Sequence, residues 1–227
     1  MKYGIMGAMP DEVDQLCARL SGVEVQQYAG VEYHQGRLGD KEVVVCCAGM
    51  GKANAAATTQ VLCGKFGAQA IIFSGIAGNM SEEIGIGDVV VGKEVCYHDA
   101  EVSMICQSAP FLKSYTGDPA LVQAALDACA ALGVKAIAGR IATGDTFVGD
   151  GATKAVIAEK VHPDCVEMEG AAVSQIAAKN GVPCVILRAM SDNADEDGHE
   201  VLVVKKFSIA EYVATATKIV AAMVEAL

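Results

Sequence analysis

The chain has 227 residues, of which 52% are apolar and 20% charged, and its net charge is −11. This length and composition are typical of a globular chain with a large buried core, and we expect one domain over residues 1–227. The negative charge argues against binding to nucleic acid or to an anionic membrane surface, because both need a basic footprint on the protein. Asp11 and Glu12 come too early for a signal peptide, and no apolar run approaches the roughly 20 residues of a membrane span, so we expect a cytoplasmic protein.

Cysteine and histidine form no recognisable disulfide or metal-ligand pattern. The chain has nine cysteines, an odd number, with no CxxC pair, and its four histidines are scattered. This usage favours reduced thiols that serve as small buried apolar side chains. We therefore expect no disulfide framework, no metal site and no cofactor.

Strand-like and helix-like stretches alternate along the chain, which predicts an α/β fold with a central mixed β-sheet flanked by helices on both faces. Up to residue 74, the apolar patterns predict strands at 3–8, 31–38, 42–47 and 70–74, and helices at 10–20 and 52–65. In the rest of the chain they predict strands at 88–95, 135–142, 165–168 and 183–189, and helices at 119–132, 152–160, 170–179 and 208–226.

The predicted strands end in small or potentially functional residues. Ligands of open α/β sheets bind outside the carboxyl ends of the strands, and glycine lets backbone N–H groups approach a ligand closely. Six such strand ends on one sheet edge therefore predict a single pocket, and they lie at 7–9, 49–51, 75–78, 143–145, 167–169 and 191–192.

The most informative segment follows the apolar run at 182–187, which is typical of a buried strand in a parallel sheet. Arg188 and Asp192 come where this strand should end, so they can share one site. A buried carboxyl group in such a place is a functional candidate. The acidic run at 195–197 fits a solvated loop instead.

Other candidates each have a structural alternative. Glu12 lies in the first turn of a predicted helix, where the helix dipole favours a carboxylate whatever the function. Glu167 and Glu169 would point to opposite faces of an extended strand, so that one enters the crevice, but either could also be a helix-start acid. The His-Asp pair at 98–99 has no serine nucleophile beside it and fits a structural or interface role. The segment 49–54 lacks the third glycine of a dinucleotide fingerprint, which favours a tight turn.

The acids and the arginine at predicted strand and helix ends favour acid–base chemistry. No metal cluster, Cys–His pair or phosphate loop accompanies them in the sequence. Acid–base chemistry on a neutral ligand is then the natural choice. Cleavage at a glycosidic carbon is one reaction that needs both an acid for the leaving group and a base for the nucleophile.

Eight collinear motifs, which run over most of the chain, resemble those of the 5′-methylthioadenosine/S-adenosylhomocysteine nucleosidase family in the purine nucleoside phosphorylase-like superfamily. A set of motifs with similar spacing is far more specific than any single one. The motifs are GIMGAMPDEV (4–13), AGMGKANAA (48–56), SGIAG (74–78), IGDVVV (86–91), YHDAEVS (97–103), TGDTFV (143–148), VEMEGAAV (166–173) and RAMSDNAD (188–195).

The resemblance implies a nucleoside phosphorylase-like fold and an N-ribosyl hydrolase that splits the bond between adenine N9 and ribose C1′. Asp192 would protonate or hydrogen-bond adenine N7. Glu12 would position and activate the attacking water, with help from Arg188. Glu169 would hold the ribose hydroxyls, and Met168 would pack against the sugar.

The resemblance also implies which residues surround the base and the 5′ substituent. Phe147 would stack on adenine, the Val148 backbone would read the adenine edge, and Ser191 would support the acid at position 192. The other expected substrate-binding residues are Met9 and Met50, on the side of the ribose and the 5′ substituent, together with Ile76, Ala77, Gly78 and Glu167. The implied partners are a small adenine nucleoside and a second copy of the chain in a homodimer.

Glu12 favours hydrolysis over phosphorolysis, because an anion beside the nucleophile repels phosphate. Three departures from the family pattern stand out: the first removes a hydroxyl contact near the water, and the other two concern the 5′ preference. Ile76 stands where the family often has serine, the stretch 104–118 is short and lacks the aromatic- and Gly-rich pattern, and the loop 195–207 is long. An aminodeoxyfutalosine hydrolase, a purine nucleoside phosphorylase and a non-catalytic nucleoside-binding protein stay open as alternatives.

Overall fold

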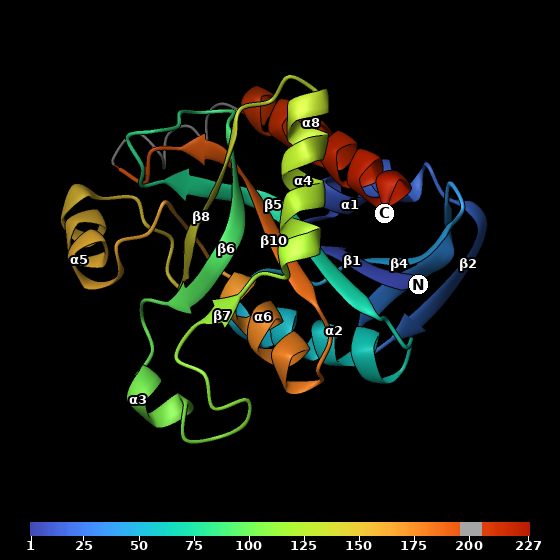
Figure 1. Cartoon of the computed structure of the whole chain (residues 1–227), viewed down its shortest axis with the longest axis horizontal. Helices are drawn as coiled ribbons and strands as arrows, with labels where there is room; N and C mark the ends of the chain where they lie inside the picture. The colour runs from blue at the N-terminus through green and yellow to red at the C-terminus, as the bar shows by residue number, and fades with distance from the viewer. Residues whose placement is uncertain (196–205) are drawn as a thin grey trace.

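A computed structural model of the chain describes residues 1–195 and 206–227. Within these residues, ten strands form one mixed β-sheet that carries helices on both faces (Figure 1). The strands are β1 (Lys2–Gly7), β2 (Ser21–Tyr28), β3 (Val31–Leu38), β4 (Lys41–Cys47), β5 (Ala70–Asn79), β6 (Val89–Tyr97), β7 (Tyr115–Thr116), β8 (Ala136–Thr143), β9 (Cys165–Glu167) and β10 (Cys184–Asp192). The helices are α1 (Pro10–Cys17), α2 (Lys52–Gly64), α3 (Val102–Ile105), α4 (Pro119–Ala131), α5 (Gly151–Val161), α6 (Gly170–Lys179) and α8 (Lys206–Ala226).

The sheet has two parts that share the long strand β5. On one side of it, β1 pairs with β5 and β4 in parallel, and β3 and β2 continue the sheet to an edge. On the other side, β5, β10, β6, β8 and β9 pair in a ring, because β10 and β9 both pair with β5. The sheet is therefore open at the β2 end and closed like a small barrel at the other.

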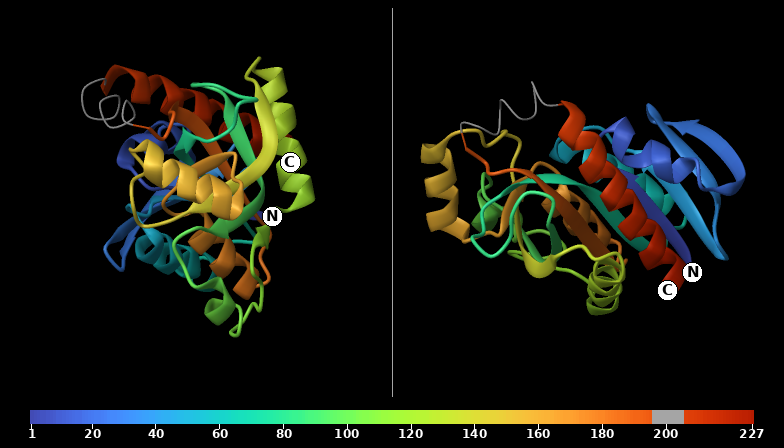
Figure 2. Two further views of the ribbon diagram at one scale, coloured as in Figure 1. Left: turned by 90° about the vertical axis from the view of Figure 1, so that its left-hand side faces the viewer. Right: turned by 90° about the horizontal axis from the view of Figure 1, so that it is seen from above.

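Alternating side chains of the strands build a core on each face of the sheet. In β1, Ile5 packs with the residues of α1, α4 and α8, whereas Met6 packs with those of α2 and α6 on the opposite face. This is the period of two expected of strands that are covered on both faces. The two views of Figure 2 show these helix layers, with the β2–β3 hairpin extending beyond them at one end.

The predicted mixed sheet with helices on both faces is confirmed, but several boundaries differ. β5 and β10 run on to Asn79 and Asp192, beyond their predicted ends, because they keep pairing with each other past the apolar segments, with one register shift between Met190 and Asp192. α1 ends at Cys17 rather than at residue 20. The predicted long loop at 195–207 lies almost entirely outside the described residues.

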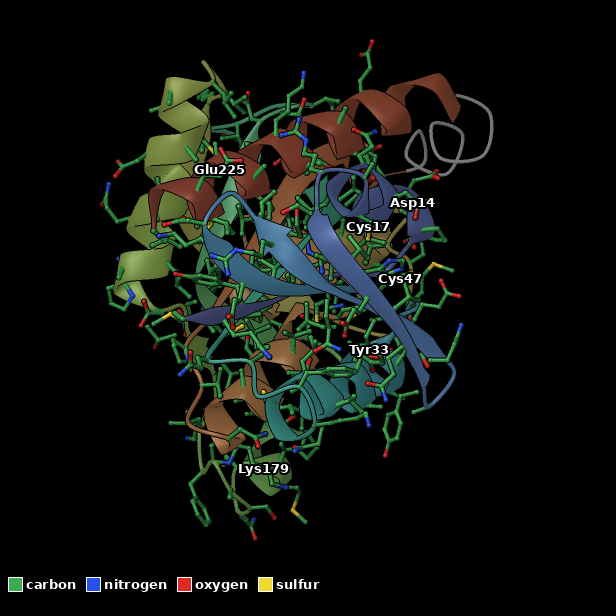
Figure 3. All side chains as sticks on the ribbon, turned by 90° about the vertical axis from the view of Figure 1, so that its right-hand side faces the viewer. Asp14, Cys17, Tyr33, Cys47, Lys179 and Glu225 are labelled. Atoms are coloured by element: carbon green, nitrogen blue, oxygen red, sulfur yellow. The ribbon has the colours of Figure 1, made fainter. Side chains whose placement is uncertain are left out.

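The edge strand β2 was not predicted from the sequence. All eight of its residues are exposed, so it has no alternation of buried and exposed positions. Its partner β3 carries the buried Tyr33, whose ring stacks on Phe66 with centroids 4.5 Å apart. Figure 3 looks onto this end of the molecule, where Tyr33 is labelled beneath the hairpin. In this hairpin, the buried contacts come from β3 and not from β2.

Candidate active site

A cavity opens where the carboxyl ends of β1, β5, β9 and β10 meet. Thirteen of the fourteen residues singled out from the sequence line this cavity. Of the six strand ends predicted to meet in one pocket, five contribute to it and the end at 143–145 does not. They are Met9, Glu12, Met50, Ile76, Ala77, Gly78, Phe147, Glu167, Met168, Glu169, Arg188, Ser191 and Asp192, joined by Ala8 and Val166. The fourteenth, Val148, lines an adjoining recess together with Thr146, Phe147 and Asp192.

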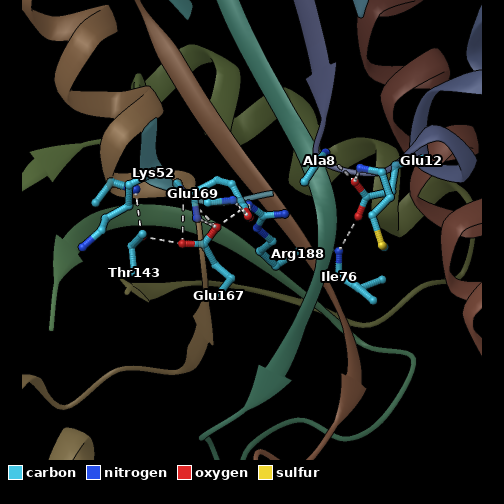
Figure 4. A network of polar contacts seen from close by, with 12 residues as sticks. Ala8, Glu12, Lys52, Ile76, Thr143, Glu167, Glu169 and Arg188 are labelled. Carbon is cyan, nitrogen blue, oxygen red and sulfur yellow. Dashed lines mark hydrogen bonds and ion pairs between the residues drawn. The ribbon is translucent and has the colours of Figure 1, made fainter. Parts of the chain in front are cut away.

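Glu12 enters the cavity from the first turn of α1. Its Oε2 accepts hydrogen bonds from the backbone N–H groups of Ala8 (2.6 Å) and Met9 (2.9 Å), and its Oε1 accepts one from Ile76 (3.3 Å). Figure 4 shows this carboxylate between the ends of β1 and β5. Burial raises the pKa of Glu12, although the charge of Arg188 and the three backbone donors oppose that shift. Glu12 is thus both a helix-start acid and a wall of the cavity.

Gly75 leaves the space in which Glu12 and Arg188 come together. A Cβ atom on Gly75 would overlap Nη1 of Arg188 and would lie 2.7 Å from Oε1 of Glu12. Any side chain at this position of β5 would therefore displace one of the two charged groups. The strand-end pattern predicted a glycine at this position, and here Gly75 allows the side chains of Glu12 and Arg188 to approach each other closely.

Arg188 is buried in β10, with only 1% of its surface exposed. Its Nη2 forms ion pairs with Glu167 and, at 3.4 Å, with Glu169. The guanidinium carbon lies 4.3 Å from the centre of the Phe73 ring. Burial alone would lower the pKa of Arg188, but the surrounding carboxylates outweigh it and raise that pKa. A cation so enclosed holds the carboxylates around it in place.

The carboxylate of Glu167 is hydrogen-bonded by several groups of the protein. Its carboxylate accepts the hydroxyl of Thr143, the backbone N–H groups of Glu169 (3.1 Å) and Gly170 (2.8 Å), and Nη2 of Arg188. These bonds satisfy the N-terminus of α6, as the alternative of a helix-start acid requires. The expectation that Glu167 and Glu169 point to opposite faces is wrong, because β9 ends at Glu167 and the chain turns, bringing both carboxylates to the guanidinium (Figure 4).

Glu169 is the carboxylate of this group with the fewest protein donors. Its Oε1 accepts the backbone N–H of Gly51 at 2.8 Å, and its Oε2 lies 3.4 Å from Nη2 of Arg188. Burial raises the pKa of Glu169 to about 7, and the nearby charges of Glu167 and Glu12 add to that rise, while Arg188 and Gly51 oppose it. A carboxyl group with this pKa can bind a proton or a ligand hydroxyl near neutral pH.

Asp192 closes the other end of the cavity and is 3% exposed. Its Oδ1 accepts the N–H of Ala194 at 2.8 Å, and its Oδ2 lies 2.8 Å from Oγ of Ser191. The same Oγ lies 3.3 Å from the carbonyl oxygen of Ala77. The pairing of β10 with β5 is irregular between Met190 and Asp192, and such a bulge re-aims side chains at a strand end.

Comparisons with known proteins show the family of this chain. A family model described as the phosphorylase superfamily matches residues 2–225. The 5′-methylthioadenosine/S-adenosylhomocysteine nucleosidase of Shewanella sediminis (strain HAW-EB3) is 41% identical over 203 residues, which cover 87% of this chain and 88% of that protein. The chain belongs to this nucleosidase family of the phosphorylase superfamily.

Solved structures of family members have the same fold. The S-adenosylhomocysteine nucleosidase of Streptococcus pyogenes, in complex with 5-methylthiotubericidin, superposes with a TM-score of 0.93 at 34% identity and covers 100% of this chain and 97% of that one. The futalosine hydrolase of Helicobacter pylori strain 26695 superposes with a TM-score of 0.89 at 30% identity, covering 100% and 98%. The shared fold therefore hosts more than one 5′ specificity.

The structure adds residues that the sequence did not single out. Thr143 donates its hydroxyl to Glu167 and accepts the N–H of Ala171 at 2.8 Å, so it joins β8 to the start of α6. The backbone N–H groups of Ala8 and Gly51 bind the carboxylates of the cavity. Side-chain patterns carry no signal for such backbone donors, although each of them lies in a strand end that the sequence marked.

Two global features also bear on the site. All nine cysteines are free thiols. In the described part of the chain, no helix is both long and apolar enough to cross a membrane, and no three His, Cys, Asp or Glu side chains are grouped so that they could hold a metal ion.

Proposed function

We propose that this protein hydrolyses the N-glycosidic bond of adenosines with a 5′-thio substituent, such as methylthioadenosine and S-adenosylhomocysteine, and releases adenine and a 5-thioribose. The observation that carries this proposal is that Glu12 and Asp192, which come from opposite ends of the chain, line one cavity. Family membership supports the same reaction, since the relatives of known function include nucleosidases of these two substrates.

Adenine fits the end of the cavity that continues into the recess of Phe147 and Val148. Asp192 lines both spaces, so a base seated there would present its N7 to that carboxyl group. Ser191 can donate its single proton either to Asp192 or to the carbonyl oxygen of Ala77. In the second arrangement it can accept a hydrogen bond from a protonated Asp192. This arrangement suits an acid that gives its proton to the leaving base.

The ribose would lie at the other end, between Met168 and the carboxylates of Glu12 and Glu169. A ribosyl group that loses its base develops positive charge, and carboxylates already fixed in a buried site stabilise that charge without reorganising. Glu169, with its few protein donors, can accept hydrogen bonds from the ribose hydroxyls. Met9 and Met50 line the cavity and would face the sugar and its 5′ substituent.

Water is the nucleophile that the site favours. Glu12 and Glu169 place two carboxylates on the ribose side, and Arg188 is already engaged by Glu167 and Glu169. A phosphate ion would thus meet two carboxylates, and the charge of the guanidinium among these residues is already balanced by ion pairs. A water molecule beside Oε1 of Glu12 would instead find a hydrogen-bond acceptor and a general base.

The test is a panel of 5′-substituted adenosines assayed for adenine release with and without phosphate. We expect adenine from methylthioadenosine and S-adenosylhomocysteine at rates independent of phosphate. Release that depends on phosphate would make the protein a phosphorylase. Aminodeoxyfutalosine belongs in the panel because a futalosine hydrolase has the same fold. Preferential release of adenine from aminodeoxyfutalosine would show that the enzyme prefers that 5′ substituent. Tight binding of all substrates without cleavage would indicate a binding protein.

A further inference from the structure

A cluster of charged side chains beside the cavity ties three distant segments together. Asp99 follows β6, Lys52 begins α2 and Asp145 follows β8. Nζ of Lys52 lies 2.8 and 2.7 Å from the two carboxylate oxygens of Asp99 and 3.4 Å from Oδ2 of Asp145. We call these three residues the 52–99–145 clamp.

Backbone groups complete the clamp. Oδ2 of Asp99 accepts the N–H of Asp145 at 2.8 Å, and Oδ1 of Asp145 accepts the N–H of Lys52 at 2.9 Å. Each segment is therefore bonded to both of the others. The ammonium also lies 5.6 Å from the centre of the Tyr97 ring. So many charge-assisted bonds among three loops fix their relative positions.

The loops that the clamp joins carry two walls of the cavity. Met50 stands two residues before Lys52, and Phe147 stands two residues after Asp145. Between Met50 and Lys52 lies Gly51, whose N–H binds Glu169, and a Cβ on this glycine would lie 3.3 Å from Oδ1 of Asp145. The clamp is thus in direct contact with the loop that supplies a donor to the ribose-side carboxylate.

The Lys52–Asp99 ion pair stays charged near neutral pH. Burial alone would raise the pKa of Asp99, but the hydrogen bond and charge of Lys52, together with the N–H of Asp145, outweigh burial and lower it. Burial would likewise lower the pKa of Lys52, but Asp99 outweighs burial and raises it. The Lys52 and Asp99 side chains are only 23% and 26% exposed, so salt screens this pair less than a surface pair.

We propose that Asp99 is a positioning residue for the nucleosidase reaction: through Lys52 and Asp145 it holds the Met50 and Phe147 walls at the separation that the nucleoside needs and keeps the Gly51 N–H on Glu169. This proposal rests on the proposed function. None of the three clamp side chains lines the cavity, so their effect on the substrate passes through the loops.

The effect on Glu169 gives the proposal its diagnostic signature. Glu169 faces Arg188 of β10, Glu167 of β9, Glu12 of α1 and the Gly51 N–H ahead of α2. The first three do not depend on the clamp, but the Gly51 donor does. Loss of that donor removes a bond that favours the carboxylate, so the pKa of Glu169 rises. The limb of the kcat/KM profile that requires ionised Glu169 would move to higher pH.

The experiment compares Asp99→Asn, Lys52→Met and the double variant with wild type. We expect each single variant to lower kcat/KM for methylthioadenosine about 10- to 100-fold, mainly through KM, as the loss of charge-assisted hydrogen bonds implies. The double variant should be no worse than either single one, because the three residues act as a unit. Lys52→Arg, which keeps the charge, should recover most of the loss. The matched control is Glu94→Gln, which removes an ion pair with Arg140 from the same strand β6 and should leave KM unchanged.

Hydrogen exchange of the segments 49–52 and 143–148 is the second measurement, and it does not depend on activity. Faster exchange in both segments of Asp99→Asn, together with the shifted pH limb, supports the clamp. Unchanged exchange and an unchanged pH limb would overturn it, as would single losses that add in the double variant. If Asp99→Asn fails to fold, Asp145→Asn, whose side chain is 54% exposed, replaces it under the same criteria. Failure of wild type to release adenine from any substrate would overturn the proposed function, while the exchange data would still decide on the clamp.

Discussion

Arg188 is surrounded by more carboxylates than it can neutralise. Nη2 of Arg188 donates to both Glu167 and Glu169, while Glu12 lies opposite the guanidinium beside Gly75. Removing one partner of a buried ion pair leaves an uncompensated charge and costs several kcal/mol, so these residues are coupled. The excess negative charge suits a site that stabilises a developing cation.

Asp192→Asn tests the proposed acid. Asparagine keeps the size of the side chain and can still bond to Ser191, but it cannot give a proton to the base. We expect kcat for adenine release to fall about 10²- to 10⁴-fold, the range for loss of a general acid. The measurement is steady-state adenine release, with the exposed Asp14→Asn on α1 as control (Figure 3). Full activity of Asp192→Asn would rule out the assigned role.

Gly75→Ala tests the close approach of the two charged groups. The new methyl group would overlap Arg188 and crowd Glu12, so one of them must move. Displacement of a catalytic group by about 1 Å can cost roughly 10²-fold in rate, and we expect kcat/KM to fall by at least that much. Gly85→Ala is the matched control, because its Cβ would meet nothing within 4 Å. Equal activity of the two variants would contradict this geometry.

At the scale of single residues, the sequence indicated which residues line the cavity, but it indicated their hydrogen-bond partners less well. Residue types at strand ends and the family motifs marked the lining residues, because ends of parallel strands converge whatever their partners. The helix-start alternative covered the bonds of Glu167 to α6, but its bond with Thr143 was not predictable, since it depends on where β9 stops and the chain turns. That turn is a property of tertiary packing.

The elements were predictable where burial leaves a periodic pattern. α6 begins and ends as predicted, because its apolar residues follow one face and Glu167 caps its start. β2 was missed because all of it is exposed, and the ends of β5 and β10 were missed because glycine, serine and charged residues continue both strands. This continuation carries Gly78 and Asp192 into the site, so part of the site lies on strand ends that were predicted as loop.

α4 provides a test at the scale of one helix. Asp118 caps it by accepting the N–H groups of Ala120 (3.0 Å) and Leu121 (3.1 Å). We expect Asp118→Ala to lower the free energy of unfolding by about 1 kcal/mol, as loss of an N-cap does, and to leave adenine release unchanged. Chemical denaturation measures the first and the enzyme assay the second. Asp127→Ala, in the same helix but outside its cap, should be neutral in both.

The stability of the whole molecule should depend on Glu169. Because its folded-state pKa of about 7 lies above the usual 4.5, the folded protein binds a proton that the unfolded chain releases between these values. The stabilisation is fully present below about pH 4.5 and is lost as pH rises through 7. Between pH 5 and pH 8, we expect the free energy of unfolding of Glu169→Gln to fall by roughly 1–3 kcal/mol less than that of the wild type. Urea denaturation at the two pH values checks this, and the exposed Glu24→Gln should behave as wild type.

A homodimer remains a prediction at the scale of the assembly. Met104, Phe111 and Leu112 are 63%, 69% and 43% exposed in the segment between β6 and β7, and a group of exposed apolar side chains favours coverage by a second chain. We expect sedimentation of a dimer at micromolar concentration. Phe111→Glu should shift the equilibrium toward monomer, whereas a monomeric wild type would refute the prediction.

The order of the strands along the chain has a consequence for when the enzyme becomes active during its synthesis. Glu12 follows the first strand and Asp192 ends the last, and β5 joins them by pairing with both β1 and β10. During synthesis, the proposed water-holding acid is therefore made long before the acid proposed to protonate the base. We therefore expect a fragment that stops short of β10 to release no adenine, because it lacks the proposed leaving-group acid.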